Sequence, residues 1–254
     1  MIVFVTGASV GFGAAIARRF ASEGYRVVAC ARRLEKLEAL VEEFGPRVLA
    51  RALDVRDPEA VRKLVAELPA DFRDLDILVN NAGLALGTEP AQRASLDDWE
   101  RMVDTNIKGL MYCTRAILPG MVARNRGHVI NIGSTAGTYP YPGGNCYGAT
   151  KAFVHQFSLN LRADLLGTAV RVTSIEPGLG GGTEFSEVRY HGDGGRAAKV
   201  YEDTQPLTAD DIADTAWWVT QRPPHVNIDY VSILPTCQAC GPYAIHREKR
   251  SFRP

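Results

Sequence analysis

Three side chains in the middle of the chain have the chemistry to move a proton to or from an oxygen atom. Tyr147 and Lys151 are four residues apart, so on a helix they share one face. An ammonium group beside a phenol can lower the phenol's pKa from about 10 toward neutrality. Ser134 follows an apolar run typical of a buried strand and can hydrogen-bond the same oxygen. The set predicts acid–base chemistry at a carbonyl or alcohol oxygen.

A glycine-rich segment near the N-terminus is a candidate ligand site. Residues 6–13 read Thr-Gly-Ala-Ser-Val-Gly-Phe-Gly and lie between a strand-like run and a helical one. Glycines permit a tight turn and close backbone approach, and a helix N-terminus offers N–H groups to a pyrophosphate. A turn without a ligand is the simpler alternative, but the flanking strand and helix favour a dinucleotide. The candidate contacts are Gly7, Ser9, Gly11, Phe12 and Gly13.

The end of the second strand-like run bears on the choice between NAD and NADP. NAD-binding proteins of this kind place an acidic residue about 20 residues beyond the glycines, on the ribose 2′-OH. Here the run ends in Ala31-Arg32-Arg33. No carboxylate stands there to repel a 2′-phosphate, and both guanidiniums can bind one through charge-assisted hydrogen bonds. We therefore expect NADP(H), with Arg32 and Arg33 as its phosphate ligands.

The order of apolar and amphipathic segments indicates how these groups are positioned. Short β-branched runs alternate with longer amphipathic stretches, as in βαβ units with helices on both faces of a parallel sheet. We expect a Rossmann-type α/β fold with a doubly wound parallel sheet of about seven strands. The expected strands are 2–6, 26–31, 48–54, 76–80, 128–133, 170–176 and 230–234. The expected helices are 14–23, 35–44, 58–68, 96–125, 147–165 and 209–220.

One segment interrupts this alternation. Residues 178–207 are rich in glycine and charge, with a single short helical candidate at 196–203. Long irregular stretches in compact domains are usually functional lids or disordered loops, and the prompt return of regular patterning favours a lid. No linker or repeat divides the chain, so we expect one domain over 1–254, with a lid at 178–207 and a charged tail at 241–254.

Composition narrows the class of protein. The 254 residues are 46% hydrophobic and 23% charged, enough for one large packed domain. Lys and Arg total 29 and balance 29 Asp and Glu, so a nucleic-acid or membrane-surface partner is not expected. Five scattered cysteines do not form a secreted disulfide scaffold, and no apolar run approaches the roughly 18 residues of a membrane span. We expect a cytoplasmic protein that acts on a small molecule.

Two of the cysteines form a C-x-x-C pattern, at Cys237 and Cys240. A four-ligand zinc site would need a second pair, and the chain has none. No helix obviously follows the pair to activate a thiolate. We interpret the pair as structural or incidental and expect no metal.

Four motifs in order resemble the short-chain dehydrogenase/reductase family over essentially the whole chain. They are the G-x-x-x-G-x-G pattern of residues 7–13, Asn80-Asn81-Ala82-Gly83, Ser134, and Tyr147-x-x-x-Lys151. The resemblance implies an NADP(H)-dependent oxidoreductase acting on alcohols and carbonyls, with Tyr147 as proton donor and Ser134 on the substrate oxygen. It also implies that the Asn106 amide supports a water relay to Lys151.

The resemblance extends to cofactor contacts. It implies that Asp54 and Val55 flank the adenine, and that the block after the fourth strand lines the ribose through Asn81, Ala82 and Gly83. Tyr147 and Lys151 would face the nicotinamide ribose. Pro177 and Gly178 would face the nicotinamide carboxamide, joined by Thr183, which stands further from this pair than the family's usual threonine.

Further motifs are similar to one branch, the bacterial NADP-dependent 3-hydroxy acid dehydrogenases. They include Gly133-Ser134-Thr135-Ala136-Gly137 and residues 181–186, Gly-Gly-Thr-Glu-Phe-Ser. The similarity implies substrates such as 3-hydroxypropionate, serine or allo-threonine, interconverted with a semialdehyde or keto form. The alternative is an NADPH-dependent sulfoacetaldehyde reductase that forms isethionate. The sulfonate of sulfoacetaldehyde stands one carbon from the carbonyl carbon, as the carboxylate does in the 3-hydroxy acid substrates.

All of these substrates carry an anion, and Lys151 is already assigned to the tyrosine and the ribose. We therefore expect an arginine of the lid or the tail to bind the acidic group, although charged tails are often only solvated. The substrate-binding candidates are Ser134, Tyr147, Gly144, Arg189, Arg196 and Arg250. The resemblance also implies a homo-oligomer, usually a tetramer, formed through helices 106–124 and 147–165.

Overall fold

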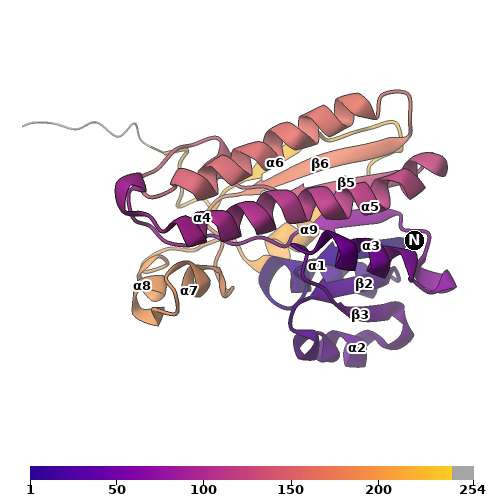
Figure 1. Ribbon diagram of the computed structural model, residues 1–254, viewed down its shortest axis with the longest axis horizontal. Helices are drawn as coiled ribbons and strands as arrows, with labels where there is room; N and C mark the ends of the chain where they lie inside the picture. Colours follow the sequence, from indigo (N-terminus) through magenta and orange to yellow (C-terminus); the bar gives the residue numbers. More distant parts are fainter. Residues whose placement is uncertain (242–254) are drawn as a thin grey trace, which may run out of the picture.

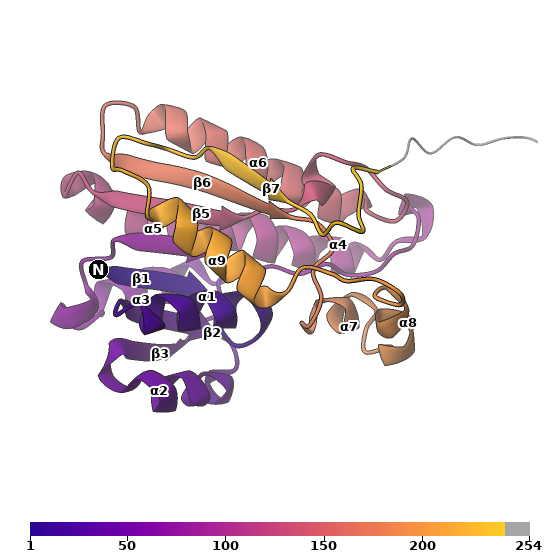
Figure 2. The same cartoon turned by 180° about the vertical axis from the view of Figure 1, so that it is seen from behind.

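The computed structural model describes residues 1–241, and the alternation of strands and helices builds one sheet (Figures 1 and 2). Its seven strands follow the order β3-β2-β1-β4-β5-β6-β7, and every neighbouring pair is parallel. The predicted fold class is confirmed. The strands are β1 (Ile2–Thr6), β2 (Arg26–Ala31), β3 (Val48–Ala52), β4 (Ile77–Asn80), β5 (Gly127–Ile132), β6 (Val170–Pro177) and β7 (Tyr230–Ile233).

Both faces of the sheet are covered, which is why its central strands are apolar at successive positions. Val3 and Val5 point to one layer and Phe4 to the other, and all three are fully buried. Helices α1 (Gly11–Ser22), α2 (Glu38–Phe44) and α9 (Ala209–Thr220) cover the first face. Helices α3 (Pro58–Ala66), α5 (Leu110–Ala123) and α6 (Asn145–Asp164) cover the second. Figure 1 has α5 and α6 in front, and Figure 2 has α9 in front.

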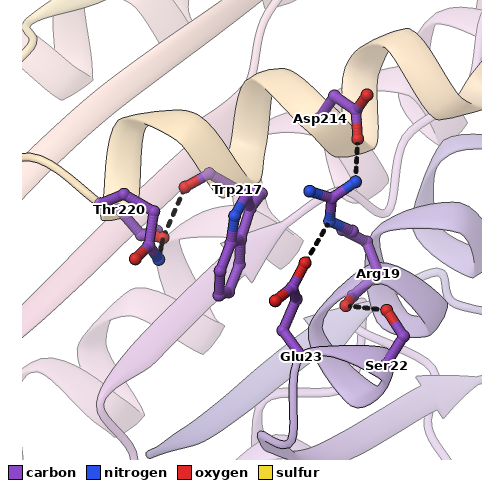
Figure 3. Close-up of polar contacts among 7 residues, drawn as sticks. Arg19, Ser22, Glu23, Asp214, Trp217 and Thr220 are labelled. Atoms are coloured by element: carbon purple, nitrogen blue, oxygen red, sulfur yellow. Dashed lines mark hydrogen bonds and ion pairs between the residues drawn. The ribbon is translucent and has the colours of Figure 1, made fainter.

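Helix α9 is fixed on α1 by a mixed apolar and ionic contact (Figure 3). The Arg19 guanidinium pairs with Glu23 at 3.2 Å and with Asp214 of α9 at 2.5 Å. The same guanidinium lies 5.7 Å from the centre of the Trp217 ring, which packs edge-on against Phe20. This contact joins the last long helix to the first one.

The long helix expected over 96–125 is divided. Helix α4 (Leu96–Val103) leads into a π-helical segment, Asp104–Gly109, and α5 follows. Pro119 lies inside α5. Helix α1 also differs from the expectation, since it begins at Gly11 rather than at residue 14. Glycine lowers helix propensity, which is why the pattern alone predicts a later start.

The segment predicted to be a lid has more regular structure than expected. It forms two short helices, α7 (Phe185–Arg189) and α8 (Gly194–Lys199), where the sequence predicts one at 196–203. Both lie at one end of the sheet in Figures 1 and 2. A parallel bridge between Gly180 and Leu207 joins the two ends of the segment at its base. The tail predicted over 241–254 lies outside the described residues except for Gly241.

Within residues 1–241, no helix is long and apolar enough to span a membrane. The same residues contain no group of three or more His, Cys, Asp or Glu side chains arranged to hold a metal ion. All five cysteines are free thiols, including Cys237 and Cys240, which are exposed.

Candidate active site

A cavity of about 560 Å³ lies beyond the carboxyl ends of the strands. Open parallel sheets bind ligands at this edge, where the strand order changes direction next to β1. The glycine-rich turn, the ends of β2 and β4, the start of α6 and the lid all contribute to its lining. The predicted residues that line it are Gly7, Ser9, Gly11, Phe12, Arg32, Arg33, Asp54, Val55, Asn81, Ala82, Gly83, Ser134, Tyr147, Lys151, Pro177, Gly178, Thr183 and Arg189.

The glycine-rich turn has a shape that side chains would block. Gly7 and Gly11 adopt positive φ values of 66° and 58°, which favour glycine. A Cβ on Gly13 would lie 2.3 Å from the Gly7 carbonyl oxygen and 2.4 Å from Asn81 Nδ2. Helix α1 starts directly at this turn, so its free N–H groups face the cavity end of the loop. This cradle fits a dinucleotide pyrophosphate.

Strands β1 and β4 are tied together beside the turn. The Thr6 hydroxyl accepts hydrogen bonds from the Asn81 N–H at 3.0 Å and the Ala82 N–H at 2.9 Å. Asn81 Nδ2 donates to the carbonyl oxygens of Thr6 at 2.9 Å and Gly7 at 3.2 Å. The residues predicted to line the cofactor ribose are therefore held rigidly against the glycine-rich turn.

The predicted phosphate ligands stand at one end of the cavity, and Arg33 already has a partner. Its Nη2 lies 2.6 Å from a carboxylate oxygen of Glu184, and Lys36 Nζ lies 2.6 Å from the other oxygen. The side-chain hydrogen bonds from Arg33 and Lys36 lower the pKa of Glu184. Nearby, the Arg56 guanidinium holds Asp54 at 2.6 Å and lowers the pKa of that carboxyl. The sequence interpretation did not single out Lys36 or Glu184.

Tyr147, Lys151 and Ser134 converge as predicted. Tyr147 and Lys151 lie on α6 and are both buried, and the Lys151 ammonium lies 5.9 Å from the centre of the Tyr147 ring. Lys151 Nζ donates to the Ile132 carbonyl oxygen at 2.7 Å. Ser134 follows β5, and its Oγ accepts a hydrogen bond from the Ala136 N–H at 3.1 Å. Strand β5 and helix α6 therefore position the acid–base groups together.

Burial controls the pKa values of this pair. It raises the pKa of Tyr147 to about 12, against smaller opposing effects of the Ser134 hydrogen bond and the Arg189 charge. It also lowers the pKa of Lys151 to about 8. The expectation that Lys151 brings the phenol pKa toward neutrality is not met in this structure, because burial outweighs the groups that lower the pKa, and these groups are Ser134 and Arg189 rather than Lys151.

Asn106 occupies the π-helical segment and is buried. Its Nδ2 donates to Leu84 O at 2.8 Å and to Thr150 Oγ1 at 3.0 Å, and its Oδ1 accepts from the Leu84 N–H at 2.9 Å. A Cβ on Gly83 would lie 3.3 Å from Asn106 Oδ1 and 3.6 Å from Lys151 Nζ. The amide thus joins the loop after β4 to α6 beside Lys151. Its part in a water relay stays a prediction.

The far end of the cavity is shaped by the strand β6 terminus and the lid. Leu179 N–H donates to Gln238 Oε1 at 2.6 Å, which fixes the Pro177-Gly178 turn against the segment after β7. A Cβ on Gly11 would lie 2.9 Å from Thr183 Cγ2, so the lid meets the glycine-rich turn at Thr183. Thr183 therefore reaches the cofactor cradle despite the three glycines before it. Gln238 is a further residue that sequence patterning did not indicate.

The family model described as short chain dehydrogenase matches residues 1–192. The chain belongs to this family. The NADP-dependent 3-hydroxy acid dehydrogenase of Salmonella typhimurium is 62% identical over 97% of this chain and 100% of that protein. The serine 3-dehydrogenase of Agrobacterium fabrum is 50% identical over 97% and 98%. A solved structure, the closed form of a serine dehydrogenase complexed with NADP⁺, superposes with a TM-score of 0.96 at 58% identity, over 98% and 100% of the two chains.

The anion-binding candidates of this short-chain dehydrogenase separate into three groups. Arg189, on α7, lines the cavity, with its guanidinium carbon 5.8 Å from the centre of the Tyr147 ring and its Nη2 donating to Tyr141 Oη at 2.9 Å. Arg196 is exposed and donates instead to Thr88 Oγ1 at 3.1 Å, outside the cavity lining. Arg250 lies outside the described residues.

The Gly144 N–H, a predicted substrate-binding group, is not free to donate a hydrogen bond to the substrate anion. Gly144 is the residue before α6, and its N–H donates to the Tyr141 carbonyl oxygen at 3.0 Å. A Cβ there would meet the Tyr141 ring at 2.7 Å, which explains the need for glycine at this position. Close packing rather than ligand binding accounts for the glycine at position 144.

Of the three candidate arginines, Arg189 alone is brought to the catalytic group within residues 1–241.

Proposed function

We propose that this short-chain dehydrogenase interconverts a 3-hydroxy acid and its semialdehyde or keto form with NADP(H). The observation that carries the substrate assignment is Arg189, whose positive charge stands beside Tyr147 in the same cavity. An anionic group one carbon from the reacting carbon can reach this guanidinium while the reacting oxygen faces Tyr147 and Ser134. The names of the relatives support this class of substrate.

The cofactor is assigned to residues that fit it. The glycine cradle from Gly7 to Gly13 would hold the pyrophosphate, and Arg32 and Arg33 would bind the 2′-phosphate. Asp54 and Val55 would flank the adenine, and the block of Asn81, Ala82 and Gly83 would line the ribose. Pro177, Gly178 and Thr183 would enclose the nicotinamide. When bound, NADPH supplies the hydride for carbonyl reduction.

The protein contributes acid–base chemistry and orientation. In reduction, Tyr147 Oη donates its proton to the substrate oxygen, and Ser134 Oγ donates a hydrogen bond that holds this oxygen in place. With a pKa of about 12, the phenol carries its proton at neutral pH, and its transfer depends on stabilisation of the phenolate that forms. The positive charges of Lys151 and Arg189 stabilise the phenolate that remains. Asn106 holds the loop beside Lys151 in place.

The experiment is a steady-state comparison of substrates in wild-type and Arg189→Met enzyme. Malonic semialdehyde, sulfoacetaldehyde and propanal are reduced with NADPH, and serine, allo-threonine and isethionate are tested in reverse. We expect Arg189→Met to lower kcat/KM for the anionic aldehyde by a factor that corresponds to about 2–4 kcal/mol, with little change for propanal. Arg196→Met, in the same lid, is the matched control.

Two results would count against this assignment. An equal loss for propanal would show that Arg189 supports the lid rather than the anion. A preference for sulfoacetaldehyde over malonic semialdehyde would make sulfonate reduction the function, which no name among the relatives described above supports.

The assembly and the compartment complete the proposal. We assign a homotetramer through helices α5 and α6, where Met111 is 36% exposed and the Phe153 ring stacks on Phe157. The free thiols of all five cysteines fit a reducing cytoplasm. Sedimentation velocity of the purified protein tests the tetramer directly.

A further inference from the structure

The lid touches the phosphate end of the cofactor site through one carboxylate. Glu184 accepts hydrogen bonds from Arg33 Nη2 and from Lys36 Nζ, each at 2.6 Å. Arg33 precedes the short 3-10 helix Leu34–Leu37, which follows β2, and Lys36 lies within this helix. We call Arg33, Lys36 and Glu184 the phosphate-end cluster. The three side chains are between 34% and 44% exposed, so solvent screens the pairs only in part.

The position of Glu184 is set by the lid rather than by a free loop. The preceding residue, Thr183, packs on Gly11, and α7 begins at the following residue, Phe185. The Phe185 ring in turn packs edge-on against Tyr147 at 5.7 Å between centres. The carboxylate is therefore anchored on both sides, at the cofactor cradle and at the catalytic tyrosine.

The charges of the cluster decide what Glu184 does to a phosphate. Arg32, Arg33 and Lys36 supply three positive charges at this end of the site, and Glu184 neutralises one of them while occupying donors of two. A 2′-phosphate carries about −1.5 to −2 charges near neutral pH and needs the same donors. Like charges that share a group of cations repel each other. NADH has no such phosphate and does not compete.

We propose that Glu184 is a specificity-determining residue that competes with the 2′-phosphate of NADP(H) for Arg33 and Lys36. Lys36 is then a third phosphate ligand, available once Glu184 releases it. The proposal rests on the NADP(H) use stated under the proposed function. The competition lowers the preference for NADPH over NADH. When NADP(H) binds, Arg33 and Lys36 give up their contact with Glu184 and bind the 2′-phosphate instead.

The test measures the dissociation constants of NADPH and NADH by fluorescence titration of the purified enzyme. The readout is the ratio Kd(NADH)/Kd(NADPH), in which any general loosening of the lid cancels. Glu184→Gln should raise this ratio about three- to tenfold at low salt, and the gain should shrink as salt screens the charges. Glu187→Gln removes the same charge three residues further along the lid, and Glu187 forms no ion pair with the described residues. This control should leave the ratio unchanged.

A second variant separates competition from simple electrostatic attraction. Lys36→Gln should lower the ratio, and it should do so more strongly in the Glu184→Gln background, where the ammonium is released to the phosphate. An equal effect in both backgrounds would contradict the competition for Lys36.

The remaining outcomes are distinguishable. If wild type prefers NADPH but Glu184→Gln leaves the ratio unchanged or lowers it, the competition is refuted while the proposed function stands. If wild type binds NADH as tightly as NADPH, the proposed cofactor fails, and the inference that depends on it fails too.

Discussion

At the Tyr147 phenol, desolvation and charge act in opposite directions on one proton. Burial raises the pKa, while Ser134 and Arg189 pull it down, and the result is about 12. A phenol with this value donates its proton readily only when the phenolate gains support in the transition state. Two cations stand close enough to the ring to give that support, Lys151 at 5.9 Å and Arg189 at 5.8 Å.

Replacement of the phenol tests its role directly. Tyr147→Phe should abolish measurable turnover, because the hydroxyl acts on the substrate oxygen in the transition state, and should leave NADPH affinity nearly intact. The two quantities are measured by steady-state kinetics and by fluorescence titration. Turnover at the wild-type rate would exclude Tyr147 as the proton donor.

The cofactor preference is tested at the end of β2. Changing Ala31→Asp and converting Arg32 and Arg33 to neutral residues should shift preference toward NADH, because it removes charge-assisted bonds worth about 1.5–3 kcal/mol each. Kinetics with both cofactors measure the shift. If the wild-type enzyme uses NADH as efficiently as NADPH, Arg32 and Arg33 do not select NADP(H).

The residues that sequence spacing located and those it missed differ in a physical way. Tyr147 and Lys151 lie on one helix, so the helical period alone places them together. Glu184 meets Arg33 across 151 residues and Lys36 across 148, and Gln238 meets Leu179 across 59. No local pattern encodes such pairs. Only the folded lid and the segment after β7 bring them together.

Among the elements, the π-helical segment 104–109 is one that sequence patterning does not predict. Its residues carry an ordinary helical pattern, and the wider backbone turn there is supported by tertiary bonds from Asn106 to Leu84 and Thr150. The strands were predicted within a few residues, because runs buried on both faces are apolar throughout. The lid helices α7 and α8 are five and six residues long, too short for a clear period.

Two neighbouring tryptophans of α9 allow the contact between α1 and α9 to be tested, because one lies in the contact and the other is exposed. Trp217 packs on Phe20 and Tyr25, whereas the next residue, Trp218, is 45% exposed. Trp217→Ala should lower the free energy of unfolding by about 2–4 kcal/mol through lost burial, and Trp218→Ala by less than about 1 kcal/mol. Urea denaturation measures both. Equal losses would mean that α9 is not held on α1 by this ring.

For the whole molecule, a titratable side chain buried on the first face of the sheet has a large effect on stability. His128, in β5, is 2% exposed, and its Nε2 pairs with Thr173 Oγ1 at 2.8 Å. Burial, with a smaller contribution from the Arg171 charge, lowers its pKa to about 3. In the unfolded chain the histidine has an ordinary pKa near 6.5. Below that pH it therefore binds a proton in the unfolded chain, while it stays neutral in the folded chain.

The folded state should therefore lose stability as the pH falls from 7 toward 3. Between pH 7 and pH 5 this one group should remove about 2 kcal/mol from the free energy of unfolding. Denaturation by urea at the two pH values, in wild type and in His128→Gln, isolates its share. A variant whose stability depends on pH as strongly as that of wild type would rule out His128 as the cause.

The central place of β1 in the sheet has a consequence for the protein during its synthesis. Val3 pairs with Val27 on one side and with Ile77 on the other, 74 residues downstream. A ribosome that adds roughly 5–20 residues per second needs about 4–15 s to cover that interval. Throughout this time the apolar β1 has at least one open edge in the nascent chain, and capture by a chaperone or mispairing with another chain would then compete with folding. Closure of that edge by β4 also brings Asn81 onto the glycine-rich turn, so the cofactor cradle and the protection of the first strand are completed in the same step.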